Sequence, residues 1–270
     1  CYHIKPCHLA CQTPRNVMSF MRLLLLCLVC LPLAPAQAEK LSVAAAADLK
    51  FAMASLITSF RKDHPADTIE ATYGSSGAFY AQIRQGAPFD LFFSADKSYP
   101  ERLVQDGLAA SPVKPYAKGR LVLWSANRDA SRMKLADLAD PAIRRIAIAN
   151  PKHAPYGRCA EEVLRQAGLW STVEPRLVYG ENIAQTAQLV ATGNADVGLI
   201  ALSLASQPEL ARQGGYFLIP ENLHAPLEQG FVITRHGKDN PLAGAFAAFM
   251  DTHAAREALS HHGFALPEAR

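Results

Sequence analysis

The stretch LSVAAAADLKFAMASLITSFRKDHPADTIEATYG (41–74) decides the fold class. It begins with an apolar run typical of a buried strand, and Leu49, Met53 and Leu56 then recur at helical spacing. The β-rich segment TIEATYG (68–74) follows. This order indicates a βαβ unit, whose two strands lie parallel in one sheet.

The same alternation continues along the chain and predicts a two-lobed α/β fold, with mostly parallel sheets, helices on both faces and a ligand cleft between the lobes. The proline-containing stretch SPVKPYAKG (111–119) interrupts the pattern and leads into a second lobe. The strand GFVITRH (230–236) returns to the first. We expect lobe 1 at 39–116 and 230–270 and lobe 2 at 117–229, with further strands at 90–95, 120–126, 143–150, 176–180 and 195–201.

Residues 21–38, MRLLLLCLVCLPLAPAQA, have the form of a secretory signal peptide, with one arginine, about ten apolar residues and a small-x-small end. The apolar run is too short to span a bilayer. We expect cleavage after Ala38 and a periplasmic location. The hydrophilic residues 1–20 are interpreted as an over-extended start, with Met18 or Met21 as the true one.

Cysteine and charge counts change once residues 1–38 are removed. Five of the six cysteines lie there, so the mature chain keeps only Cys159 and forms no internal disulfide. We expect this thiol to be buried rather than reactive. Residues 1–38 also hold three of the 27 basic residues and none of the 24 acidic ones, so the mature chain has no formal net charge. A basic nucleic-acid-binding protein is therefore excluded.

Four strand-to-helix junctions form the candidate ligand site, because ligands of open α/β sheets bind beyond the carboxyl ends of the strands. Each junction sets small residues, proline or a hydroxyl beside the free backbone N–H groups of a helix N-terminus, which attract anions. A site in which four helix N-termini face one dianion needs no lysine or arginine, because the helix dipoles supply the positive charge. The junctions are AAAADL (44–49), YGSSGAF (73–79), NPKHAPYG (150–157) and YGENIAQ (179–185).

Over essentially all of residues 40–266 the chain resembles the periplasmic molybdate-binding proteins of ABC importers, which have the type II periplasmic-binding-protein fold. The stretches GAPFDLFFSAD (86–96) and NPKHAPYG (150–157) are the most diagnostic. The resemblance implies a monomer whose two lobes close on one oxyanion, molybdate or tungstate, and deliver it to a membrane permease. It implies neither a cofactor nor catalysis.

The resemblance also implies the ligand positions, which can be carried over one at a time. The first helix N-terminus falls at Ala47 and Asp48. The serine turn supplies a hydroxyl donor at Ser76, with Ser75 beside it. Lobe 2 supplies backbone N–H donors at Tyr156 and Ile183.

Asp48 departs from the family pattern, in which Ser, Thr or Asn stands as a hydrogen-bond donor, because an ionised aspartate only accepts. Two like charges about 4 Å apart repel by roughly 4 kcal/mol at an effective dielectric near 20. Three solutions stay open: the side chain turns inward as an N-cap, it is protonated, or it accepts a proton from a protonated oxyanion. We favour the N-cap, since Asp is among the best N-cap residues.

Other functions also stay open. The same fold serves a protein that binds sulfate, phosphate or another oxyanion. A secreted serine hydrolase is the remote alternative, because YGSSGA nearly matches a nucleophile elbow with Ser76 as nucleophile. Ala78 stands where that motif has glycine, and no His or Asp context supports a triad. The histidines 253, 261 and 262 lack the partners of a metal site.

Overall fold

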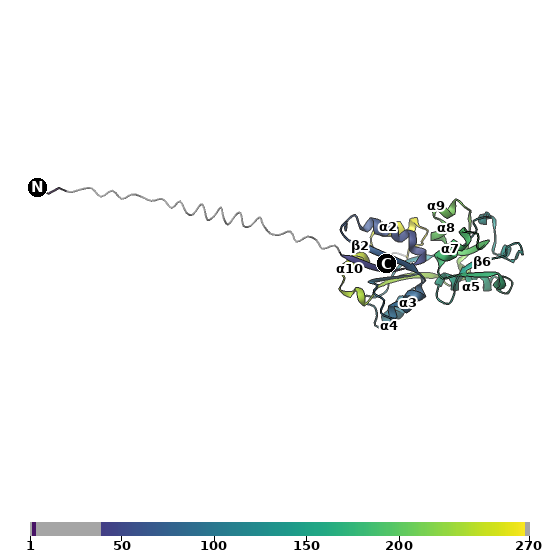
Figure 1. The fold of residues 1–270 in the computed structure, drawn as a ribbon, viewed down its shortest axis with the longest axis horizontal. Helices are drawn as coiled ribbons and strands as arrows, with labels where there is room; N and C mark the ends of the chain where they lie inside the picture. Colours follow the sequence, from purple (N-terminus) through teal and green to yellow (C-terminus); the bar gives the residue numbers. More distant parts are fainter. Residues whose placement is uncertain (1, 4–38, 268–270) are drawn as a thin grey trace. The chain divides into compact units, whose positions relative to one another are not determined.

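The computed structural model describes residues 2–3 and 39–267 (Figure 1). The expected extension at 1–20 and the expected signal peptide at 21–38 lie outside the described residues, apart from Tyr2 and His3. Residues 39–267 lie within one compact unit that contains two five-stranded sheets. Among the described residues, no helix combines the length and the apolar character that crossing a bilayer requires.

The first sheet consists of β1 (Lys40–Ala46), β2 (Thr68–Gly74), β3 (Leu91–Ser94), β4 (Lys114–Gly119) and β10 (Leu227–Ile233). Their order is β2-β1-β3-β10-β4. β1 pairs in parallel with β2 and β3, which confirms the βαβ unit predicted from residues 41–74. β10 pairs antiparallel with β3 and β4, so the strand predicted near residue 230 does return to this sheet.

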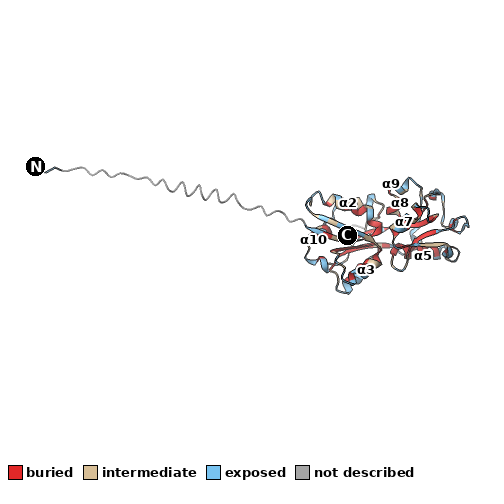
Figure 2. Ribbon diagram, viewed as in Figure 1, coloured by how far each residue is buried: buried red, intermediate tan, exposed pale blue. Residues whose placement is uncertain are grey.

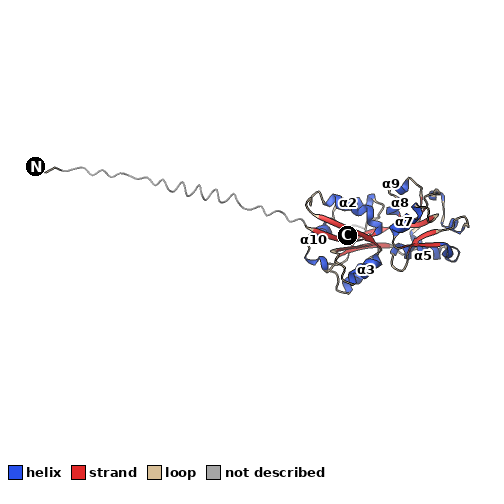
Figure 3. Ribbon diagram, viewed as in Figure 1, coloured by secondary structure: helices blue, strands red, loops and turns tan. Residues whose placement is uncertain are grey.

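Helices cover both faces of the first sheet because its central strands are apolar on both sides. Successive side chains of a strand point to opposite faces, and Phe92 accordingly packs with Phe79 whereas Phe93 packs with Phe246. α3 (Ser76–Arg84) and α4 (Ser98–Gln105) cover the face of Phe92. α2 (Lys50–Phe60), α10 (Pro241–Phe249) and α11 (His253–His261) cover the other, and Figure 3 shows α2 and α3 on opposite sides of the strands.

The second sheet repeats this plan with β5 (Leu121–Trp124), β6 (Ile146–Ala149), β7 (Leu177–Gly180), β8 (Val197–Ala201) and β9 (Tyr216–Leu218). The order is β7-β6-β8-β5-β9, in which β6 is parallel to β7 and β8 while β5 is antiparallel to β8 and β9. Buried residues concentrate in the strands and on the helix sides that face them (Figure 2). The helices of this part are α5 (Pro155–Gln166), α6 (Trp170–Val173), α7 (Ile183–Ala191), α8 (Leu202–Ala205) and α9 (Pro208–Ala211).

Each sheet therefore joins a parallel βαβ part to antiparallel strands, and the predicted fold class is confirmed. The sequence prediction misses two edge strands, β4 and β9. The stretch 111–119 is expected to interrupt the alternation, yet six of its residues form β4. Pro115 is tolerated because an edge strand can do without one ladder N–H. The predicted lobe boundaries at 116/117 and 229/230 fall inside β4 and β10, and the division of the chain between the lobes stays a prediction.

Candidate functional site

A small cavity lies where the carboxyl ends of β1, β2 and β3 meet the first turns of α5 and α7. Its volume of about 10 Å3 is comparable with the space that one water molecule needs. In this arrangement the cavity suits a compact group of a few atoms and excludes a sugar or an amino acid. The lining residues are Ala46, Ala47, Asp48, Gly74, Ser75, Ser76, Ala95, Ala154, Pro155, Tyr156 and Ile183.

The structure brings together all six residues predicted for the ligand site, and each of them is buried. They are Ala47, Asp48, Ser75, Ser76, Tyr156 and Ile183. The lining set belongs entirely to the described part of the chain and contains no lysine, arginine or histidine. Partial positive charge therefore reaches the cavity from backbone N–H groups and helix dipoles rather than from cationic side chains.

Local sequence fixes where the helices that face the cavity begin. Ser75 is the N-cap of α3, and its hydroxyl oxygen accepts a hydrogen bond from the N–H of Ala78 at 3.4 Å. α5 begins at Pro155, which suits a first turn because its missing N–H would have had no helical partner. Asn182 caps α7. The first N–H groups of α5 and α7, those of Tyr156 and Ile183, have no helical partner to bind, whereas those of Gly157 and Gln185 donate to Ala154 and Asn182.

The Ser76 side chain lines the cavity and keeps a hydroxyl proton available. Its Oγ accepts a hydrogen bond from the backbone N–H of Ala95, with 3.0 Å between nitrogen and oxygen. That bond uses an oxygen lone pair and leaves the hydroxyl proton free. The proton is therefore available to an anion, which needs donors.

Asp48 is not an N-cap, so that prediction is wrong. The residue lies inside the short 3-10 helix η1 (Ala47–Leu49), which has no side-chain cap. The carboxylate does turn inward, but it is held by tertiary contacts. Its Oδ2 accepts hydrogen bonds from Gln229 Nε2 at 2.7 Å and from the Tyr156 hydroxyl at 3.0 Å. The carboxylate therefore binds two partners that are distant in sequence instead of capping a helix.

The environment of Asp48 makes its carboxyl harder to ionise than an exposed one. The side chain is 1% exposed and its Oδ1 has no hydrogen-bond partner among the described residues. Burial raises the pKa of this carboxyl to about 6, against the opposing effect of the bonds from Gln229 and Tyr156 and of the nearby backbone N–H groups of Asp48 and Leu49. Sequence reasoning misses Gln229, which belongs to β10 and is fully buried.

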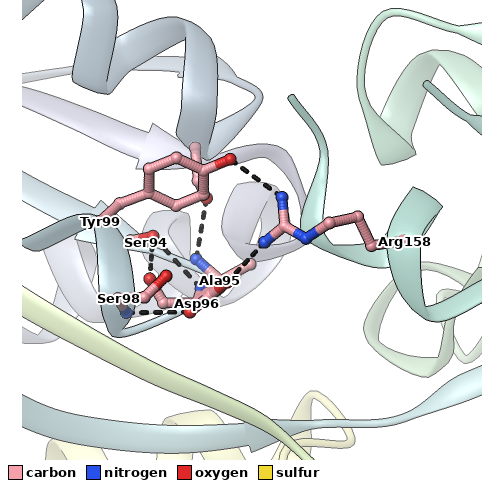
Figure 4. Close-up of polar contacts among 7 residues, drawn as sticks. Ser94, Ala95, Asp96, Ser98, Tyr99 and Arg158 are labelled. Atoms are coloured by element: carbon pink, nitrogen blue, oxygen red, sulfur yellow. Dashed lines mark hydrogen bonds and ion pairs between the residues drawn. The ribbon is translucent and has the colours of Figure 1, made fainter. Parts of the chain in front are cut away.

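A second polar network joins the two halves of the molecule next to the cavity (Figure 4). Arg158 of α5 forms an ion pair with Asp96 and donates a hydrogen bond to the Tyr99 hydroxyl at 2.9 Å. Asp96 is the neighbour of Ala95, whose N–H binds Ser76. The short segment after β3 therefore holds both the Ser76 hydroxyl and the contact across the lobes, and the sequence alone gives no sign of this pairing.

Backbone contacts also bring the lobes together at the cavity. The N–H of Gly77 donates to the carbonyl of His153 at 2.9 Å, and the Ser203 hydroxyl donates to the carbonyl of Asp48 at 2.8 Å. A Cβ atom at position 77 would lie 2.7 Å from the His153 oxygen. Glycine is needed there because the two backbones approach so closely.

The geometry does not support Ser76 or Cys159 as a nucleophile. Ser76 Oγ bonds to a backbone N–H, and the histidine beside the serine pair, His153, bonds through Nδ1 to Ser75 instead. A triad needs the base on the nucleophile itself. Cys159 is buried, as predicted, and burial raises the pKa of its thiol. Within the described residues, no three His, Cys, Asp or Glu side chains are arranged to hold a metal ion.

Residues 41–265 match the family described as bacterial extracellular solute-binding protein. The chain belongs to this family. It is 39% identical over 232 residues to the molybdate-binding protein ModA of Azotobacter vinelandii, a match that covers 86% of this chain and 92% of that protein. It is 40% identical over 199 residues to ModA of Rhodobacter capsulatus, covering 73% and 77%.

Solved structures agree with this family. The periplasmic molybdate-binding protein of Azotobacter vinelandii superposes with a TM-score of 0.80 at 34% identity, over 84% of this chain and all of that one. The sulfate-binding protein SubI of Mycobacterium tuberculosis superposes with a TM-score of 0.73 at 15% identity, over 85% and 88%. The second likeness shows the shared two-lobed fold alone.

Proposed function

We propose that this family member is the extracytoplasmic solute-binding component of an ABC importer and that it captures molybdate or tungstate. Two relatives that are 39% and 40% identical to this chain over the aligned residues are named molybdate-binding proteins, and so is the solved structure that superposes at 34% identity. We assign the ligand contacts to Ala47, Asp48, Ser75, Ser76, Tyr156 and Ile183.

The observation that carries this proposal is a buried cavity lined by helix starts and a free serine hydroxyl, without a cationic side chain among its lining residues in 39–267. Each helix end contributes about 0.3–1 kcal/mol toward a bound anion. Rigid neutral donors also select by size, because a preorganised cage fits one oxyanion radius best. The small cavity volume favours such a compact ligand over an organic solute.

The proposal also covers export, location, oligomeric state and delivery of the ligand. We propose export through a signal peptide at 21–38, a periplasmic location, a monomeric state and delivery of the ligand to a permease in the membrane. We also propose that the lobes comprise 39–116 with 230–270, and 117–229. Ser76 binds the ligand in this scheme and catalyses nothing.

Calorimetric titration and thermal shift with molybdate, tungstate, sulfate, phosphate and vanadate test this proposal. Tight molybdate or tungstate binding should raise the melting temperature by mass action. Ser76→Ala should weaken binding by about 10- to 100-fold, because a hydrogen bond to a charged group contributes about 1.5–3 kcal/mol. The matched control is Ser206→Ala, which removes a buried hydroxyl without a hydrogen-bond partner in the described chain. Preferred binding of sulfate or phosphate, or an unchanged affinity for Ser76→Ala, contradicts the proposal.

A further inference from the structure

Asp48 combines a place in the cavity lining with a buried carboxyl oxygen that has no hydrogen-bond partner among the described residues. The residue lines the cavity, it is 1% exposed, and its Oδ1 has no hydrogen-bond partner in the described chain. An unpartnered buried oxygen is costly and calls for an explanation. A group bound in the cavity is the natural partner for this atom.

The other carboxyl oxygen is already committed. Gln229 Nε2 and the Tyr156 hydroxyl both donate to Oδ2. The Gln229 amide is oriented by its own oxygen, which accepts a hydrogen bond from the Tyr116 hydroxyl at 2.7 Å. Because two donors point at Oδ2, a proton on this carboxyl belongs on Oδ1, the oxygen without a hydrogen-bond partner in the described chain.

An ionised Asp48 and an unprotonated dianion are incompatible neighbours. At about 4 Å and an effective dielectric near 20, each pair of unit like charges would weaken binding by roughly a thousandfold. None of the hydrogen-bonding partners of Asp48 in the described chain is a cationic side chain. One proton between the carboxyl and the ligand removes this repulsion and turns it into a hydrogen bond.

We propose that the bound complex holds one proton between Asp48 Oδ1 and a ligand oxygen, so that capture of a dianionic oxyanion is coupled to the uptake of one proton. The two descriptions, a neutral Asp48 donating to the dianion and an ionised Asp48 accepting from the protonated anion, contain the same atoms and charge. This inference rests on the proposed function, since it requires an oxyanion in the cavity.

The groups around Asp48 make the coupling measurable. Burial holds the pKa of this carboxyl at about 6 in the ligand-free protein, so at pH 7.5 the free protein is mostly ionised there. Tyr116 and Tyr156 are buried with pKa values raised well above 10, and they stay neutral. Near the cavity, His153 bonds to Ser75 and pairs with Glu181, and Asp96, which pairs with Arg158, follows the lining residue Ala95.

The sign of the pH dependence follows from this order. Since the complex keeps its proton and the free protein loses one above pH 6, the dissociation constant should rise about tenfold for each pH unit above 6. Below pH 6 the curve should flatten, because the free protein then carries the same proton.

The test is calorimetric titration with molybdate at pH 7.5 in two buffers with different ionisation enthalpies, and across pH 5.5–8.5. The wild type should take up close to one proton. Asp48→Asn, whose amide donates without titrating, should take up none and bind with a nearly constant affinity. His153→Gln is the control, and it should keep the proton uptake and the slope.

The outcomes separate the two proposals. If the wild type binds molybdate without proton uptake or a pH slope, the coupling is wrong and the proposed function stands. The coupling is also wrong, and the proposed function stands, if the affinity of Asp48→Asn for molybdate still changes with pH as it does in the wild type. If neither molybdate nor tungstate binds to the wild type, the proposed function fails and the coupling with it. If Asp48→Asn does not fold, proton uptake that His153→Gln retains supports the coupling, and proton uptake that His153→Gln loses overturns it.

Discussion

Replacing Asp48 by Asn should stabilise the ligand-free protein at neutral pH. The carboxyl has a pKa of about 6 in the folded state against 3.8 as its ordinary value, and burial is the main cause. The folded protein therefore binds more protons than the unfolded chain between pH 3.8 and 6. Its stability falls as pH rises through this window and stays reduced above it.

The size of the effect follows from the shift in pKa. About two units correspond to roughly 3 kcal/mol, or about 6–12 °C in melting temperature for a chain of this length. Asn keeps an oxygen to accept from Gln229 and Tyr156, so the substitution removes the charge without removing these bonds. The difference should shrink as pH falls from 6 towards 4, and wild type and variant should converge below 3.8, where Asp48 becomes neutral in both states.

The assay is thermal or urea unfolding of the ligand-free wild type and Asp48→Asn from pH 4 to 8. Asp239→Asn is the matched control, because it removes one carboxylate from an exposed position. A stability difference that does not change with pH would refute the reasoning, as would an Asp48→Asn variant that is less stable than the wild type at pH 7.5.

Two further substitutions act on the contact between the lobes. Arg158→Gln should weaken molybdate binding about fivefold in a calorimetric titration, since a partly exposed ion pair contributes up to about 1 kcal/mol. Its control is Arg165→Gln, which breaks an ion pair within the same helix and should leave the affinity unchanged. Gly77→Ala should weaken binding at least tenfold, because its Cβ would lie 2.7 Å from the His153 carbonyl and keep the lobes apart. Gly244→Ala, which meets nothing within 4 Å, is its control, and equal dissociation constants for the two glycine variants would contradict this view.

The sequence predicts those features of the fold and the site that depend on neighbouring residues. An apolar run followed by a helical spacing identifies β1 and α2, and capping residues such as Ser75 and Pro155 mark where helices begin. The junctions could be foreseen as one site because the carboxyl ends of parallel strands meet at the same edge of a sheet.

Contacts between distant residues could not be predicted in this way. Gln229 reaches Asp48 across 181 positions and Arg158 reaches Asp96 across 62, and neither pair leaves a period or a motif in the sequence. Asp48 is the clearest example of a residue whose contacts could not be predicted. Its local preference predicts an N-cap, whereas the return of β10 to the first sheet brings a glutamine amide that binds the carboxylate instead.

The cavity lining has a consequence for the media in which the protein works. Dissolved salt screens the attraction between exposed charges beyond about 10 Å at 0.1 M, so a cleft lined by lysines loses affinity for anions as salt is added. The lining residues described here offer main-chain dipoles and a hydroxyl, and the six residues of the candidate site are buried. The affinity for the oxyanion should therefore change little between low and high ionic strength.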